Sequence, residues 1–277
     1  MNFPKANILI AFSTLSVALF NAPGWEVKPA GAATFANSTG VVEIDNFSHR
    51  PESVSTLAET DTFTFSSGGS VTAIADADAV ITNPPCLPEI CFPTVAGNYS
   101  SSSAFGEGSE YLGVAQSTAA VIARNFYLGA GETFSFDFRS FLGLGTSIDT
   151  SPKEAANALG NIAFYLFDSS RPETHFGFLN ISGGLNTAGS EDFLTVDASD
   201  SFNLAQTLNT SFGGFEEYAL AEVAGNFSYT FEDATYLTLL EVKTNQVMVK
   251  APEPSGTIAL LLLSGFGSAI ALKKKSR

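Results

Sequence analysis

The side chains that could perform acid-base or nucleophilic chemistry in this 277-residue chain are of few types. His49 and His175 are the two histidines, so a serine hydrolase site would have to recruit one of them. The sequence has no histidine pair at metal-binding spacing, no phosphate-binding glycine loop followed by lysine, and no Gly-x-Ser-x-Gly turn. Glycoside hydrolysis needs only two carboxylates, but the adjacent Glu216 and Glu217 would point to opposite faces of a strand. We therefore predict no enzyme activity and no cofactor, with polysaccharide hydrolysis as an alternative.

Two groups of aspartates could bind calcium. Asp76 and Asp78 share one face of a predicted strand, and Asp197 and Asp200 lie around a predicted turn. Calcium takes six to eight oxygen ligands from converging loops, and neither group has the spacing of a known calcium loop. A solvated acidic surface is the interpretation that the spacing favours, and calcium binding is an alternative.

Cys86 and Cys91 are the only cysteines and lie in the proline-rich segment NPPCLPEICFP. Outside the cytoplasm they could form a disulfide, whose small loop would contribute roughly 2 kcal/mol by limiting the unfolded chain. Two free thiols and a metal site are the alternatives, and a metal would need further ligands from elsewhere.

The charge balance makes nucleic acid an unsuitable partner. The formal net charge is −15, and six of the thirteen Lys and Arg residues lie in the terminal segments 1–32 and 251–277. The segment between them is therefore strongly acidic and would repel a phosphate backbone. Carbohydrate-binding sites favour exposed Trp or Tyr rings, and the one tryptophan, Trp25, lies in a segment that we expect to be removed.

Alternation with period two dominates the middle of the chain and predicts strands. Phe134, Phe136 and Phe138 fall on one face of such a strand, whereas 162–167 is apolar on both faces and predicts a central strand that is covered on both sides. Further strands are predicted over 41–45, 61–66, 70–82, 175–181, 192–198, 226–233 and 236–249. The predicted fold class is all-β, an antiparallel β-sandwich resembling a jelly roll.

Three shorter features modify this pattern. Gly129 to Gly131 predict a turn that joins its flanking strands as a hairpin. The order Ser151, Pro152, Lys153, Glu154 has the features of a helix start, and Gly160 would end one short helix. The serine run 100–103 predicts a flexible loop.

The N-terminal segment has the features of a signal peptide. Lys5 precedes an apolar stretch over 8–20, which is too short to span a membrane comfortably, and Ala30-Gly31-Ala32 resembles a cleavage site. Cleavage is predicted between Ala32 and Ala33. An uncleaved N-terminal anchor is the alternative.

The C-terminal segment has the features of a membrane-spanning helix. Residues 257–272 carry no charge, and as a helix they would extend ~24 Å, somewhat short of the roughly 30 Å hydrocarbon core of a bilayer. The span becomes sufficient if the lysines at 273–275 extend to the headgroups and the bilayer thins a little. The basic cluster 273–277 follows at once and would remain on the cytoplasmic side, which would place the preceding domain outside.

Pro252, Glu253 and Pro254, the apolar span and the basic end together resemble a PEP-CTERM sorting signal, which is found in bacteria, including cyanobacteria, that make exopolysaccharide. The resemblance covers only about the last 27 residues, with Ala251 and the tail lysines departing from the commonest pattern. It implies that a membrane-embedded protease of the exosortase type recognises Pro252, Glu253 and Pro254 and removes the tail. It also implies exopolysaccharide as a partner of the protein.

The expected organisation is a signal peptide over 1–32, an acidic β-sandwich over 33–250 and a sorting tail over 251–277. The predicted protein is exported, held transiently in the inner membrane and released to the cell surface or extracellular matrix. Its predicted role there is structural or interactive. The alternatives are a calcium- or glycan-binding module and a polysaccharide hydrolase.

Overall fold

A computed structural model describes residues 34–85, 93–149, 154–187 and 189–251, which are entirely strands and their connections, with no helix. No helix long and apolar enough to cross a membrane occurs in this described part. The ten strands are β1 (Thr34–Asp45), β2 (Ser53–Thr82), β3 (Val95–Leu128), β4 (Thr133–Ile148), β5 (Ala155–Asp168), β6 (His175–Thr187), β7 (Phe193–Ala198), β8 (Phe202–Ser211), β9 (Glu216–Thr230) and β10 (Thr235–Lys250). The predicted all-β antiparallel fold is confirmed, while the signal peptide and C-terminal helix lie outside the described residues.

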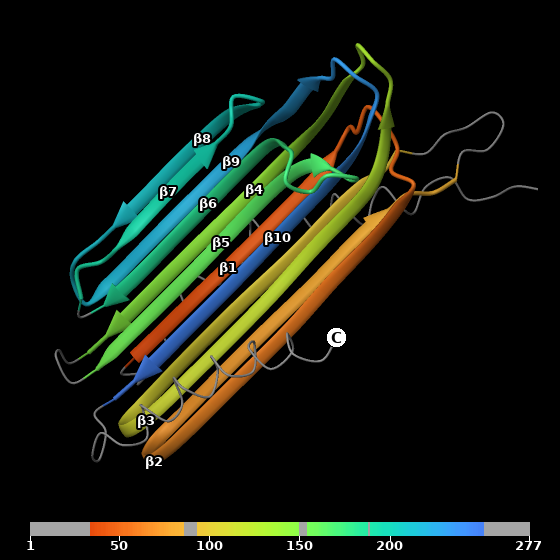
Figure 1. The fold of residues 1–277 in the computed structure, drawn as a ribbon. Coiled ribbons are helices and arrows are strands. Elements are labelled where there is room, and N and C mark those ends of the chain that lie inside the picture. The colour runs from red at the N-terminus through yellow and green to blue at the C-terminus, as the bar shows by residue number, and fades with distance from the viewer. Residues whose placement is uncertain (1–33, 86–92, 150–153, 188, 252–277) are drawn as a thin grey trace, which may run out of the picture. The chain divides into compact units, whose positions relative to one another are not determined.

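All ten strands form one antiparallel sheet in the order β7-β6-β5-β10-β3-β1-β4-β9-β8, with β2 paired to β3. The first half of β3 pairs with β1, its second half pairs with β10, and β2 follows both halves. Contacts of β1 with β10, of β4 with β5 and β6, and of β6 with β9 show that the two halves of the sheet face each other. We call β1, β4, β9 and β8 the first layer and β10, β5, β6 and β7 the second layer. In Figure 1 the β2–β3 pair folds back on itself, linking the layers.

Glycines allow the paired strands β2 and β3 to bend sharply at one point. A Cβ at Gly69 would lie 2.0 Å from the backbone oxygen of Glu107, so only glycine fits there. Opposite it, Gly108 has φ of 94° and Glu110 has φ of 59°, both in the left-handed region. The paired strands can therefore turn from one layer into the other without separating.

The space between the layers is filled at one end by phenylalanines. The predicted common face of Phe134, Phe136 and Phe138 is confirmed, because all three are 2% exposed or less. Phe164 of the second layer stacks on Phe136 with ring centroids 6.4 Å apart. Phe227 of the first layer stacks on the same ring at 5.4 Å. Burying each such ring contributes about 2 to 3 kcal/mol, which holds the layers together.

The prediction of a helix over 151–160 is wrong for the residues of this range that the structure describes. Ala155 to Gly160 belong to β5, where Ala156 and Ala158 are buried. Glu154 accepts a hydrogen bond from the backbone N–H of Asp149 at 3.0 Å rather than capping a helix. Pairing of β5 with β10 on one edge and β6 on the other outweighs the local helix signal.

Other local predictions also need correction. The turn at Gly129 to Gly131 exists, but β3 and β4 do not pair, since the chain crosses there from the second layer to the first. β5 is central, as predicted, but its outward face is not covered, because Tyr165 is 38% exposed. The serine run 100–103 is not a loop but part of β3, and Ser100 and Ser102 are fully buried.

Candidate functional site

The two ends of the described domain meet at Tyr111 in the middle of β3. Its hydroxyl donates to Oγ1 of Thr34, the first residue of β1, at 2.5 Å. Its backbone oxygen accepts from the N–H of Ala251, directly after β10, at 3.1 Å. Thr34 and Ala251 are themselves buried. Pro252, the first residue of the predicted sorting motif, therefore follows a residue that is fixed in the domain.

Tyr111 is held in this position by close packing. A Cβ at Gly106 would lie 2.2 Å from Cε2 of the Tyr111 ring, so the ring occupies the space where another residue would have a side chain. Burial raises the pKa of Tyr111 above its ordinary value, so the hydroxyl keeps its proton for the bond to Thr34. The arrangement anchors both ends of the described domain.

A polar cluster lies inside the domain, between the layers. Glu241 and Lys243 of β10 are both fully buried, and Nζ of Lys243 lies 3.3 Å from Oε1 of Glu241. Asn98 of β3 donates from its side-chain amide to Oε2 of the same carboxylate. The aliphatic chain of Lys243 fits against Gly40 of β1, where a Cβ would lie 3.0 Å from Cδ of the lysine.

Burial shifts the pKa of both charged groups toward their neutral forms. It lowers the pKa of Lys243 to about 8, although Glu241 partly offsets the effect. Burial likewise raises the pKa of Glu241, and Lys243 and Asn98 oppose that rise. Shifts of this kind can mark a catalytic pair, but both side chains have no exposed surface. The pair is consequently structural.

Asn245 extends the cluster across the layers. Its Oδ1 accepts from Oγ of Ser38 at 2.5 Å, and its Nδ2 donates to the backbone oxygen of Ser100 at 3.1 Å. Its backbone oxygen accepts from Oγ of Ser102 at 3.1 Å, and Ser102 also bonds to Ser117 at 3.0 Å. These bonds satisfy polar groups that would otherwise be costly to bury.

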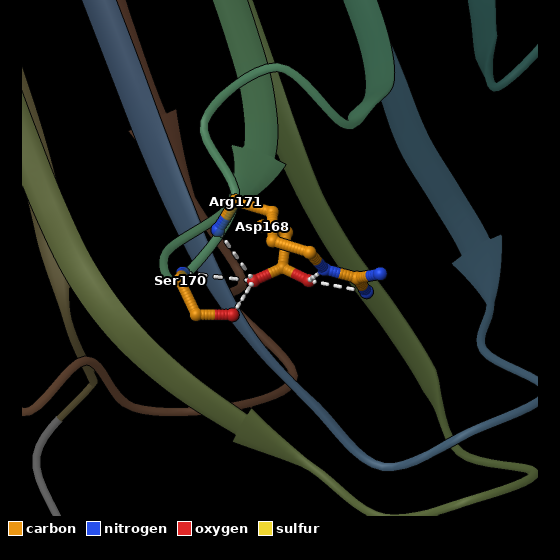
Figure 2. Close-up of polar contacts among 3 residues, drawn as sticks. All are labelled: Asp168, Ser170 and Arg171. Carbon is orange, nitrogen blue, oxygen red and sulfur yellow. Dashed lines mark hydrogen bonds and ion pairs between the residues drawn. The ribbon is translucent and has the colours of Figure 1, made fainter.

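Figure 2 shows a second charged group, at the end of β5. The Asp168 side chain is 3% exposed. Its Oδ1 accepts from the hydroxyl of Ser170 at 2.6 Å and from the Ser170 N–H at 2.8 Å. Its Oδ2 accepts from Nε and Nη2 of Arg171 at 3.1 and 2.8 Å. Burial alone would raise the pKa of Asp168, but these bonds and the guanidinium charge lower it to about 2. The carboxylate closes the turn between β5 and β6.

The two histidines make separate sets of contacts. Nδ1 of His49 lies 2.9 Å from Oγ of Ser48, and Nε2 of His49 lies 3.5 Å from Oε2 of Glu132, a serine-histidine-carboxylate sequence of contacts. However, Oγ of Ser48 accepts from the N–H of Ser135 at 2.9 Å, which ties the segment after β1 to β4. His175 begins β6 and contacts the ring of Phe167, with centroids 6.5 Å apart.

The four aspartates considered for calcium binding lie at the surface. Asp76 and Asp78 share the outward face of β2, opposite Ser101 and Tyr99 of β3. Asp197 lies on β7 and Asp200 in the turn that follows. Within the described residues no group of three or more His, Cys, Asp or Glu is placed to hold a metal ion.

The neighbouring Glu216 and Glu217 face opposite ways, as predicted. Glu216 is exposed, whereas Glu217 is 3% exposed. Oε1 of Glu217 accepts from the N–H of Gly213 at 2.8 Å, and its Oε2 accepts from the hydroxyl of Thr187. Glu217 is thus occupied in joining the β8–β9 connection to β6.

The outward surface of the second layer carries no charge over a wide area. We call it the neutral face, and it consists of the outward residues of β10 over 240–248, of β5 over 155–167 and of β6 over 178–186. Tyr165 pairs with Phe178 across its strands, and the two are 38% and 37% exposed. Thr244 pairs with Asn161, which pairs with Ser182, giving a row of hydroxyl and amide groups.

The remaining predicted site residues lie outside the described part of the chain: Ala32, Ala33, Cys86, Cys91, Pro252, Glu253 and Pro254. Sequence reasoning missed Tyr111 and the polar cluster. The signal for the cluster was the spacing of Glu241, Lys243 and Asn245, which continues the inward alternation of β10. Comparisons with protein-family models, with curated proteins and with solved structures found no match.

The buried ion pair gives a stability prediction. Lys243→Met should lower the free energy of unfolding by about 3 to 5 kcal/mol, because Glu241 would remain buried without its cation. Adding Glu241→Gln should recover more than half of that loss, since the amide is neutral and still accepts from Asn98. Urea unfolding at pH 7 measures both, with the exposed Lys250→Met of the same strand as control. Equal losses in the single and double variants would contradict the charge argument.

The low pKa of Asp168 predicts a pH-dependent stability. Asp168→Asn should cost about 2 kcal/mol at pH 7, where the charged hydrogen bonds are present. Because the folded-state pKa lies near 2 and the ordinary value is 3.8, this contribution is complete above pH 3.8 and is lost as the pH falls toward 2. Denaturant unfolding at pH 7 and pH 2.5 should show the difference from wild type shrinking. Asp200→Asn, in an exposed turn, should show no such change.

Proposed function

We propose that residues 34–251 are the delivered body of an exported protein of the cell surface or extracellular matrix, with a structural or interactive role and no enzyme activity. The observation that carries this proposal is the junction at Tyr111, where both ends of the described domain are tied. Segments removed before Thr34 and after Ala251 would leave every strand of the domain intact. The finer fold that we propose is a jelly-roll-like sandwich of the two layers.

The same geometry suits processing at the sorting motif. Two prolines at 252 and 254 remove backbone donors and favour an extended chain, which a protease of the exosortase type could read. Because Ala251 is buried and bonded to Tyr111, we propose that the protease acts beyond Ala251. Until it is cut, the protein would be held in the inner membrane by the helix over 257–272. Exopolysaccharide is the proposed partner outside, and the acidic charge disfavours nucleic acid.

Mass spectrometry of the protein recovered from its host tests this proposal. We expect an N-terminus at Ala33 and a C-terminus within or near residues 252–254. Pro252→Ala combined with Pro254→Ala should leave the full tail attached and the protein in the membrane fraction. Pro172→Ala, in an exposed turn, is the control and should be processed normally. Recovery of the wild-type chain with Met1 and Arg277 both present would overturn the proposal.

The neutral face favours glycan binding as a second candidate function. Exposed aromatic rings can stack on sugar rings, and the nearby row of Thr, Asn and Ser side chains can exchange hydrogen bonds with sugar hydroxyls. An uncharged surface also avoids the repulsion that exposed acids of the first layer, such as Asp137 and Glu222, would exert on an anionic polysaccharide. Calcium binding has no comparable observation in its favour.

Titration calorimetry with the host exopolysaccharide tests the second candidate. Tyr165→Ala should weaken binding about tenfold, because loss of one stacked ring removes roughly 1.5 kcal/mol. Tyr218→Ala is a matched control, since Tyr218 is also 38% exposed but lies on the first layer. No heat with the wild-type protein, or equal losses in the two variants, would refute a glycan site on this face.

A further inference from the structure

Strand β8 presents an open edge to solvent. In the part of the chain that the structure describes, β8 pairs with β9 alone, and residues 205–211 are exposed on both faces. An edge strand keeps one row of N–H and C=O groups free for pairing with another strand. β2 and β7 have open edges of the same kind. The partner that can pair with these backbone groups is therefore another extended polypeptide.

The sequence of β8 favours a second copy of this chain as the pairing partner. Residues 203–209 read Asn-Leu-Ala-Gln-Thr-Leu-Asn, which is almost the same in both directions about Gln206. Antiparallel pairing of two copies about a two-fold axis at Gln206 would place Leu204 opposite Leu208 and Asn203 opposite Asn209. Apolar pairs and amide pairs directly opposite each other stabilise neighbouring strands.

Charge distinguishes β8 from the other edges. β8 has no charged residue, whereas β7 includes Asp197. The β2 edge holds four acids, and its own symmetrical run over 74–80 would place Asp76 opposite Asp78. Like charges directly opposite each other destabilise a strand pair. In a chain of net charge −15, β8 is the one of these three described edges that carries no charged residue.

We propose that two copies of this protein associate through antiparallel pairing of β8 with β8, centred on Gln206. The first layer then continues from one copy into the other as a single sheet. The pairing uses backbone groups that the folded chain already exposes, so it needs no rearrangement of β8 or β9. It is independent of the glycan candidate, because the neutral face lies on the second layer.

Sedimentation of the protein recovered from its host gives the first test. The wild-type protein should sediment as a dimer, and Gln206→Lys should sediment as a monomer, since the two lysines would face each other across the axis. Thr62→Lys places the same charge on the exposed β2 edge and should remain dimeric. A monomeric wild-type protein, or equal behaviour of the two lysine variants, would overturn the proposal.

Disulfide trapping of the full chain in its host tests the register. With Cys86→Ser and Cys91→Ser as background, Gln206→Cys should give an oxidised dimer, because each residue 206 lies opposite its own copy. Thr210→Cys should not, since the register separates the two copies of residue 210 by ~27 Å along the strands. A dimer band in neither variant, or in both equally, would refute pairing centred on Gln206.

Discussion

The buried pair of Lys243 and Glu241 constrains the whole domain. Each charge is stabilised by the other, because both are buried. Their surroundings are completed by Asn98 from the first half of β3 and by Gly40 from β1 of the first layer. A shift of the β10 register by one residue would turn both charged side chains to the neutral face and would turn Val242 into the space between the layers. We infer that the cluster contributes less to net stability than to selecting one register and one way of facing the layers, because desolvation offsets much of the attraction between buried charges.

The folded β2–β3 pair explains how one antiparallel sheet yields two layers. Each half of β3 begins a different layer, so β1 and β10 become the neighbours of a single strand. Gly69 and Gly108 are needed at the fold because backbone approaches backbone there. Each layer extends outward from β3, and among the described strands the last ones, β7 and β8, have no neighbour on their outer edges.

The alternation of apolar and polar residues correctly predicted which face of a single strand is buried. It gave wrong predictions for strand pairing and for the serine run, because these depend on strands that are distant in the sequence. The inward face of Phe134, Phe136 and Phe138 follows from period two and was confirmed. The chain around Gly129 to Gly131 looked like a hairpin, but whether two adjacent strands pair depends on the layers they join. Ser100 and Ser102 resembled a loop because the sequence does not reveal that Asn245, more than 140 residues away, supplies their partners.

The two functional regions are separated by the order of the strands. Tyr111 lies on β3, and in the first layer β1, β4 and β9 stand between β3 and β8. With about 4.8 Å between neighbouring strands, β8 lies roughly 19 Å across the sheet from the strand that anchors the ends of the described domain. The proposed removal of the terminal segments and the proposed pairing of β8 between copies would therefore use different backbone groups. A copy could pair through β8 before or after its tail is removed, which would let a membrane-held chain and a released chain form the same contact.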